Sequence, residues 1–276
     1  AIAKGTPTGR DLYLKAGSVF SGQSINVTWS GEASDRVVIG CYYMDGAQAT
    51  SCDAGSGAGA QTKPKFVGTL TDACIAANNC SYTSDFGGLS DVYDAHVDVF
   101  TDYVTVQDIR SEYSKARAFR VRGAGTGNGT AEHFILQRLE SAYSGFAPVT
   151  AENVQNGIIR DGDFGYYNAC ERQSHAGGPV PNISQCGSSG HPGGVGVYRS
   201  KPAYVLIENN TIYHGDGESI NCATSSYMTI RGNRVGNSYS STIYLGHCET
   251  TLVESNFVWG NPAENRWTTR SGSQNG

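Results

Sequence analysis

The stretch VLIENNTIYHGDGESINCAT (205–224) decides the fold, because it aligns without gaps with MTIRGNRVGNSYSSTIYLGH (228–247) and then with LVESNFVWGN (252–261). Equivalent residues are 23 positions apart when Val253 of the third segment is matched to Ile230. Two columns are aliphatic, namely Ile207, Ile230 and Val253, and Ile212, Val235 and Val258. A third column is asparagine in all three segments, namely Asn210, Asn233 and Asn256. A repeat of this length built from short β-rich runs predicts a parallel β-helix, in which each coil buries aliphatic side chains against its neighbours.

The asparagine column supports this prediction. An inward-turned Asn at a tight bend can bond to the backbone and to the next Asn, and Asn tolerates the left-handed conformation that such bends require. Plain turn propensity is the alternative, but it explains one occurrence better than three in register. We therefore expect an asparagine ladder.

Upstream of residue 205 the repeat continues only with an insertion. Ile159 enters the aliphatic column if about 25 residues are inserted at about 167–194, and Leu136 precedes it by another 23. A charged column follows the same register, namely Glu208, Arg231 and Glu254, with Arg160 before them. Opposite charges on neighbouring coils would fix the register, and the alternative is a solvated face.

Composition agrees with an all-β chain of one domain. The 276 residues include 36 Gly and 2 Met, and 16% are charged, which is too little helix-forming material for an all-α protein. We expect a single domain over 1–276, with irregular coils and disulfide loops over 1–100 and regular coils over 101–276. The sequence ends at RSGSQNG, part way through a coil. We expect missing C-terminal coils, self-association or a further chain to cover that end.

The cysteines and sequons predict a secreted protein. Eight cysteines lie in close pairs, which suggests the disulfides Cys41–Cys52, Cys74–Cys80, Cys170–Cys186 and Cys222–Cys248. A zinc site is the alternative, but neither C-x-x-C nor a suitable His pair occurs. N-glycosylation sequons begin at Asn26, Asn79, Asn128, Asn182 and Asn209. Together these features indicate an oxidising, extracellular location.

Charge and hydropathy exclude other classes of partner. No window approaches ~18 consecutive apolar residues, so no membrane span is expected. The formal net charge is −5 and the sequence contains no run of Lys or Arg, which argues against a dedicated nucleic-acid binder.

The N-terminal third carries a resemblance to a known superfamily. The phrases K-A-G, F-x-G, S-G-x-A-S, V-x-I-G and K-P-x-F-x-G over residues 15–68, with the later G-D-G-E-S-I and I-Y-L, resemble the coils of secreted right-handed β-helix proteins. These include the pectate lyase-like enzymes, chondroitinase B and alginate lyases. The resemblance covers most of the chain and implies a right-handed parallel β-helix. It implies an extended polysaccharide as the partner, most often an acidic one.

The function expected from this resemblance is a polysaccharide lyase or epimerase acting on an acidic glycan. β-Elimination from a uronate needs a base for the C5 proton, a cation for the carboxylate and a donor for the leaving oxygen. Hydrolysis would need two carboxylates instead. The alternative is a non-catalytic extracellular β-helix that serves as a surface, filament or glycan-binding adhesion module.

The candidate site follows from one further alignment. If Val197 lies one period before Ile220 and Ile243, then Tyr198, Asn221 and Tyr244 point outward in one column, and Lys201 and His247 share another. We expect Tyr198 or Lys201 to act as base, with His247, Arg199 and His191 as acid or carboxylate partner. Other expected binding residues are Arg172, His175 and His191 in the insertion, and Asn221 and Tyr244. The turn HGDGE makes Asp216 and Glu218 candidate calcium ligands.

Overall fold

The computed structural model describes residues 2–6, 9–52, 62–68, 95–114, 116–123, 129–167, 193–215, 217–238 and 241–260. Within these ranges the chain forms 27 strands in three long sheets, here called A, B and C, and one two-stranded sheet of β12 (Ala131–Glu132) and β16 (Val154–Gln155). Sheet A contains β1 (Ile2–Thr6), β2 (Gly9–Lys15), β5 (Val37–Asp45), β6 (Gln48–Ser51), β9 (Val104–Gln107), β13 (Ile135–Gln137), β17 (Ile158–Arg160), β20 (Val205–Glu208), β23 (Met228–Arg231) and β26 (Leu252–Glu254). Sheet B contains β3 (Val19–Ser21), β7 (Lys65–Val67), β10 (Arg110–Glu112), β14 (Glu140–Ala142), β18 (Asp163–Gly165), β21 (Thr211–Gly215), β24 (Arg234–Ser238) and β27 (Phe257–Trp259). Sheet C contains β4 (Ile25–Val27), β8 (Ala95–Val99), β11 (Arg117–Arg122), β15 (Val149–Glu152), β19 (Val195–Tyr198), β22 (Ile220–Ala223) and β25 (Ile243–Gly246).

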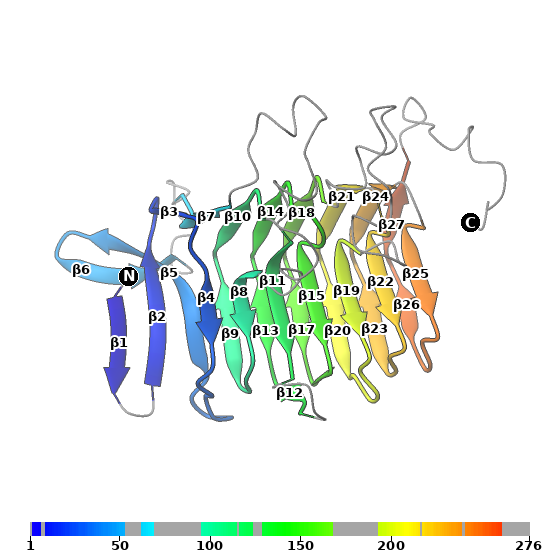
Figure 1. Cartoon of the computed structure of the whole chain (residues 1–276), viewed down its shortest axis with the longest axis horizontal. Coiled ribbons are helices and arrows are strands. Elements are labelled where there is room, and N and C mark those ends of the chain that lie inside the picture. The colour runs from blue at the N-terminus through cyan, green and yellow to red at the C-terminus, as the bar shows by residue number, and fades with distance from the viewer. Residues whose placement is uncertain are drawn as a thin grey trace.

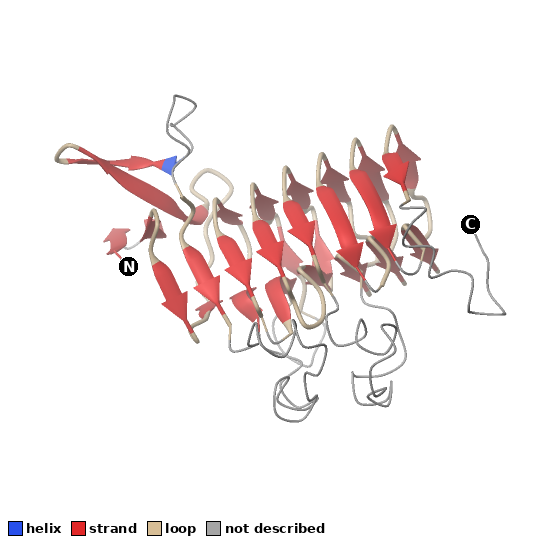
Figure 2. Cartoon of the chain, turned by 90° about the horizontal axis from the view of Figure 1, so that it is seen from above, coloured by secondary structure: helices blue, strands red, loops and turns tan. Residues whose placement is uncertain are grey.

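The chain visits the three sheets in turn. After β20, β21 and β22 it returns to sheet A as β23, which pairs in parallel with β20, and β24 and β25 pair in the same way with β21 and β22. Successive coils, which we call rungs, therefore stack along the long axis of the molecule (Figure 1), and the view from above shows the same row of strands (Figure 2). This arrangement confirms the predicted parallel β-helix.

The N-terminal end departs from this pattern. Strand β1 runs antiparallel to β2, and β6 folds back antiparallel on β5. The β5–β6 hairpin projects from that end of the stack (Figure 1).

The predicted 23-residue register is confirmed in sheets A and B. Ile207 pairs with Ile230, which pairs with Val253. Upstream, Leu136 pairs with Ile159 and Ile159 with Ile207, so the long insertion leaves the register of sheet A unchanged. The coil before Leu136 is longer than 23 residues. This is shown by the hydrogen-bonded side chains of Gln107 and Gln137 on neighbouring rungs, which are 30 residues apart.

The interior is a column of aliphatic and aromatic side chains. Ile159, Ile207, Ile212 and Ile230 are fully buried, as are the larger rings of Phe119 and Phe164. Alternation along each strand sends every second side chain into this core and the others to the outside. The outer faces of the sheets are therefore the surfaces on which chemistry can be displayed.

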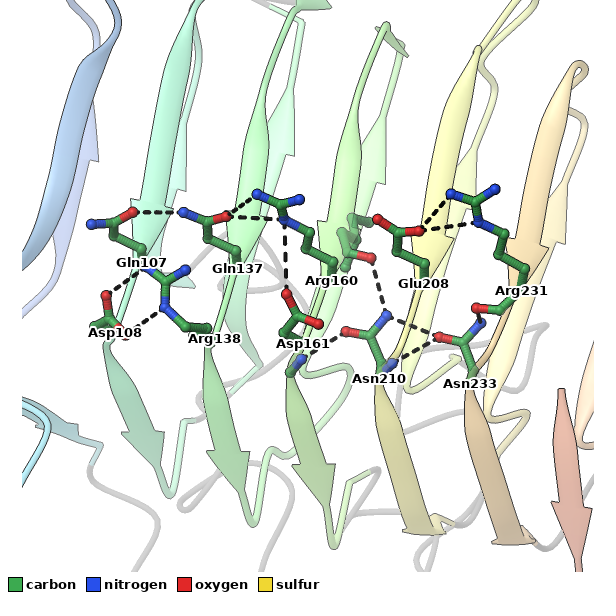
Figure 3. A network of polar contacts seen from close by, with 12 residues as sticks. Gln107, Asp108, Gln137, Arg138, Arg160, Asp161, Glu208, Asn210, Arg231 and Asn233 are labelled. Carbon is green, nitrogen blue, oxygen red and sulfur yellow. Dashed lines mark hydrogen bonds and ion pairs between the residues drawn. The ribbon is translucent and has the colours of Figure 1, made fainter. Parts of the chain in front are cut away.

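The asparagine ladder forms as predicted at the corner between sheets A and B. Nδ2 of Asn210 donates to Oδ1 of Asn233 over 3.0 Å (Figure 3). On the next rung, Nδ2 of Asn233 donates to Oδ1 of Asn256 over 2.9 Å. The backbone N–H groups of Asn210 and Asn233 donate to the same two oxygens. Because Asn210 and Asn233 are fully buried, the ladder satisfies polar groups that would otherwise lack partners.

The charged column on the outer face of sheet A also follows the register. Arg231 donates to Oε2 of Glu208 over 2.9 Å, whereas Arg160 donates to the side-chain oxygen of Gln137 (Figure 3). The Arg231 side chain is 48% exposed, so this pair contributes about 0.2–1 kcal/mol and acts mainly on register.

In sheet C the predicted register is wrong by two residues. Ile220 pairs with Val195 and with Ile243, and Val197 pairs with Cys222 instead. The turn from β19 to β20 is two residues longer than the corresponding turn from β22 to β23, and Lys201 and Pro202 are the additional residues. Tyr198, Asn221 and Tyr244 therefore do not share one column.

Two of the four predicted disulfides lie in the described residues and are formed. Cys41–Cys52 ties β5 to the end of β6, and Cys222–Cys248 ties β22 to the turn after β25 on the next rung. Cys74, Cys80, Cys170 and Cys186 lie outside the described residues. Of the sequon asparagines, Asn26 and Asn209 are exposed, and Asn79, Asn128 and Asn182 lie outside the described residues.

Candidate functional site

The outer face of sheet C gathers ionisable side chains from consecutive rungs. Strand alternation turns every second residue of β8, β11, β15 and β19 outward on this face. The charged and phenolic side chains concerned are Asp98, Arg120, Arg122, Glu152 and Tyr198. We call this surface the C face.

Asp98 anchors one end of the C face. Nε of Arg120 donates to Oδ1 of Asp98 over 2.9 Å, and Nη2 of Arg120 bonds to Oδ2, which makes the pair bidentate. Nη2 of Arg122 approaches the same Oδ2 at 3.4 Å. Burial raises the pKa of Asp98, and the neighbouring guanidinium groups lower it. The bidentate geometry fixes the orientation of both planar groups.

Arg122 is the more accessible of these two arginines. Its guanidinium lies 4.3 Å from the centroid of the Phe100 ring, and its side chain is 26% exposed. Arg120, by contrast, is 1% exposed. Arg122 is therefore held by Asp98 and Phe100 while part of it still reaches the surface.

Arg117, at the start of β11, forms an ion pair with Glu152. Nε of Arg117 donates to Oγ1 of Thr150 over 3.1 Å, and Nη2 lies 3.6 Å from Oε1 of Glu152. The guanidinium also packs 4.7 Å from the centroid of the Phe146 ring. Burial lowers the pKa of Arg117, and the Glu152 carboxylate raises it. Glu152 is itself 28% exposed, so its carboxylate is oriented by the arginine and open to the outside.

Tyr198 folds back along its own strand. A Cβ placed on Gly196 would lie 2.3 Å from the phenol ring, so the ring occupies the space that this glycine leaves. The hydroxyl accepts a hydrogen bond from the Gly193 N–H over 3.3 Å. The pKa of Tyr198 is raised to about 12, mainly by burial and in smaller part by the Glu218 and Glu152 carboxylates, while the Gly193 bond and Arg117 act in the opposite direction. The phenol is therefore protonated at neutral pH and can donate a proton.

Arg122, Glu152 and Tyr198 share one column on three consecutive rungs. Arg122 pairs with Glu152 in the backbone register, and Glu152 pairs with Tyr198. Neighbouring strands lie about 4.8 Å apart, so the three groups follow one another along the solenoid axis. A cation, a carboxylate and a protonated phenol thus lie in a row on the C face.

Glu218 and Asn221 lie deeper beside Tyr198. Nδ2 of Asn221 donates to Oε2 of Glu218 over 3.3 Å, and both residues are buried. Asp216, the other candidate calcium ligand, lies outside the described residues. Where side chains are described, no three His, Cys, Asp or Glu residues gather at a common point.

The other expected site residues occupy different places. Arg199 and His247 lie in one column with Thr224 at the corner after sheet C, each with a left-handed backbone. Lys201 pairs instead with Glu249, and its Nζ lies 2.7 Å from Oε1. The expected column of Lys201 with His247 is thus wrong, because the longer β19–β20 turn shifts the lysine.

Tyr244 lies on β25 and is 44% exposed. In register it follows Gly196 and Asn221, so it lies beside the Tyr198 column and not within it. Arg172, His175 and His191 lie outside the described residues.

Sequence reasoning missed Arg122 and Glu152, together with Asp98, Arg117 and Arg120 behind them. The aliphatic columns that set the 23-residue register are strongest in sheets A and B, and in sheet C the predicted alignment reaches back only to Val197. Extending the columns of sheet C upstream of the insertion would have placed Glu152 beside Tyr198 and Arg122 beside Glu152. That alignment needs the strand boundaries, which the Gly-rich turns do not reveal.

No helix in the described residues is long and apolar enough to cross a membrane. The sequence has no significant match among curated proteins.

Among solved structures, the chain is similar to an alginate lyase from Paenibacillus sp. str. FPU-7, with a TM-score of 0.52, 14% identity, and coverage of 92% of this chain and 71% of the lyase. It is also similar to a DFA-IIIase from Arthrobacter chlorophenolicus A6, with a TM-score of 0.52, 13% identity, and coverage of 99% of this chain and 66% of that enzyme. At these identities the likeness concerns the fold.

The model of the family described as "Right handed beta helix region" matches residues 100–275. This match covers more than half of the chain and agrees with the parallel coils of sheets A, B and C. The protein therefore belongs to the right-handed β-helix family.

Proposed function

We propose that the protein is a secreted enzyme that modifies an acidic polysaccharide on the C face, by β-elimination or by epimerisation at uronate C5. The observation that carries the proposal is the column of Arg122, Glu152 and Tyr198 on consecutive rungs. Each of these groups has a partner that fixes its position, and each is partly exposed.

The three groups match the three needs of β-elimination. The Arg122 guanidinium pairs with the uronate carboxylate and stabilises the charge that develops when C5 loses its proton. The Glu152 carboxylate takes that proton as the C5–H bond breaks. The Tyr198 hydroxyl gives its proton to the leaving oxygen as the C4–O bond breaks and the C4–C5 double bond forms. In epimerisation the phenol returns a proton to the opposite face of C5 instead.

This assignment changes the role first expected for Tyr198. A phenol with a pKa near 12 is a poor base at neutral pH, because only a very small fraction is ionised. The same value suits a proton donor. Lys201, Arg199 and His247 stay predictions at the edge of the C face, and a calcium ion at Glu218 stays a prediction as well.

The comparisons support a carbohydrate substrate. Both similar enzymes are named for carbohydrate reactions, and one of them is a lyase of alginate, a polymer of uronates. The two disulfides of the described residues fit an oxidising compartment, which supports secretion.

Hydrolysis is a second candidate, and one observation favours it. The Glu152 and Glu218 carboxylates both lie close enough to Tyr198 to raise its pKa. Two carboxylates beside a glycosidic bond can serve as acid and base. The buried state of Glu218 argues against this role, since its carboxylate is already bonded to Asn221.

The experiment incubates the purified chain with alginate, polygalacturonate and chondroitin. Ultraviolet absorbance detects unsaturated uronates, proton NMR detects epimerised units, and a reducing-end assay detects hydrolysis. We expect unsaturated or epimerised products, which Arg122→Gln, Glu152→Gln and Tyr198→Phe each reduce by a factor of about 100 or more.

Arg231→Gln is the matched control, because it removes an exposed arginine of an ion pair on sheet A and should leave the rate unchanged. Reducing ends without unsaturated products would establish hydrolysis and refute β-elimination. Binding of a glycan without any product would support the non-catalytic alternative and refute the proposed enzyme.

A further inference from the structure

The outer face of sheet B carries a group of aromatic side chains. This face is distinct from the C face. In one column, Gly165 pairs with Tyr213, Tyr213 with Gly236, and Gly236 with Trp259. Glycine and aromatic residues thus alternate on four consecutive rungs. The two aromatic residues are separated by two strand spacings, or about 9.6 Å along the axis.

Each aromatic side chain lies over the glycine of the rung before it. A Cβ on Gly165 would lie 2.6 Å from two carbons of the Tyr213 ring, and a Cβ on Gly236 would lie 2.5 Å from the Trp259 indole. Both glycines have ordinary backbone conformations, so the lack of a side chain is what these positions require. Gly165 and Gly236 therefore each leave room for an aromatic ring on the outer surface of the sheet.

Polar groups and one further aromatic side chain lie beside these two rings. Tyr213 is hydrogen-bonded to the exposed carboxylate of Asp163, and burial raises the pKa of the phenol to about 12. The Phe257 ring stacks with Trp259 at 6.1 Å between centroids and is 54% exposed. The exposed guanidinium of Arg234 lies 5.1 Å from the Phe257 centroid.

This combination is the chemistry of carbohydrate recognition. Aromatic rings present a negative π face that attracts the polarised C–H groups of a sugar, while carboxylate and guanidinium groups bond to its hydroxyls. An apolar protein partner would be poorly matched, because Asp163 and Arg234 would have to be desolvated. The spacing along the axis suits a repeating chain.

We propose that Tyr213, Trp259 and Phe257, with Asp163 and Arg234, form a second glycan-binding surface that holds a polysaccharide chain along sheet B while the C face acts on it. The inference rests on the proposed function for the identity of the ligand as a polysaccharide. Such a surface raises the effective concentration of polymer at the protein without taking part in the reaction.

The experiment measures the affinity of the full chain for alginate, polygalacturonate and inulin by electrophoresis in gels that contain each polymer. The test variant is Tyr213→Ala/Trp259→Ala, and the matched control is Tyr204→Ala/Tyr227→Ala, which removes an exposed stacked pair from the corner before sheet A. Circular dichroism and gel filtration verify that both variants are folded.

We expect the test variant to bind at least one polymer about tenfold more weakly, and the control to bind it as the parent does. Turnover of short oligosaccharides should be the same in the two variants. Unchanged affinity of the test variant, equal losses in both variants, or no binding of any of the three polymers by the parent would overturn the proposal. Glu152→Gln tests the proposed function separately from glycan binding by sheet B. If the C face is not the active surface, turnover in Glu152→Gln is unchanged, and this result does not depend on the affinity measured for the sheet B variants.

Discussion

The phenol ring of Tyr198 lies across the backbone of Gly196, two residues earlier on β19. The ring can take this position only because Gly196 has no side chain. The hydroxyl is thereby brought within 3.3 Å of the Gly193 N–H, beside the register partner Glu152. A glycine thus sets the position of the group that we assign as proton donor.

Gly196→Ala should displace the Tyr198 ring and lower kcat by about tenfold or more, because its Cβ would lie 2.3 Å from ring atoms. The fold should persist, since the Gly196 backbone is not in the left-handed region. Steady-state kinetics on the best acidic glycan, with circular dichroism, measures this effect.

Gly246→Ala is the matched control, because its Cβ would meet the Tyr244 ring at 2.5 Å on β25. We expect this control to change KM more than kcat. Equal losses of kcat in both variants would refute a special position for Tyr198.

The pH profile tests the role of the phenol. Because the pKa of Tyr198 is raised to about 12, its hydroxyl should stay protonated and the rate should not fall between about pH 7 and 10 through this group. A tyrosinate base would give a rate that rises about tenfold per pH unit over the same range. Rates measured with the parent and with Tyr198→Phe across this range distinguish the two roles.

Asn233→Ala should destabilise the solenoid. Asn233 accepts bonds from Asn210 and donates to Asn256 and to the Ile207 carbonyl, so its loss leaves buried groups without partners. We expect the free energy of unfolding to fall by about 2–3 kcal/mol. Urea denaturation measures this change.

Arg231→Ala provides the comparison for Asn233→Ala, because it removes only the exposed pair with Glu208 and should cost less than about 1 kcal/mol. Equal losses in the two variants would contradict the view that the ladder is the larger stabilising element at this corner.

His96 should contribute to loss of stability in acid. Burial lowers its pKa from 6.5 to about 4, while its Nδ1 lies 2.7 Å from the Ser111 hydroxyl. The unfolded chain takes up a proton at this histidine below about pH 6.5 and the folded chain does not, so the free energy of unfolding falls as the pH drops. The maximal loss is about 3 kcal/mol near pH 4.

Urea unfolding of the parent and of His96→Gln from pH 7 to pH 4 measures that contribution. The variant should show a smaller decrease over this range. Parallel curves for the two proteins would show that His96 does not carry the effect.

The sequence predicted the solenoid well where the repeat is constrained by buried columns. Ile207, Ile230, Asn210 and Asn233 must recur at a fixed interval, because each contacts its equivalent on the next rung. The C face was harder to predict, because outward residues can vary from rung to rung. A turn longer by Lys201 and Pro202 was enough to shift the expected columns by two residues.

Tyr198 could nevertheless be singled out, since its strand follows the long insertion and its hydroxyl is a proton carrier. Its partners Glu152 and Arg122 could not be found without strand registers, because they lie 46 and 76 residues earlier with an insertion and variable turns between them. The raised pKa of Tyr198 depends on burial, which no linear pattern shows.

The role of the C face is tested by the rate at which the full chain forms unsaturated or epimerised uronate from an acidic polysaccharide, compared with the rate of Glu152→Gln. We expect measurable turnover by the parent and a loss of about 100-fold or more in the variant, with glycan binding retained. Turnover that is equal in the two proteins would contradict the assignment of the C face as the active surface.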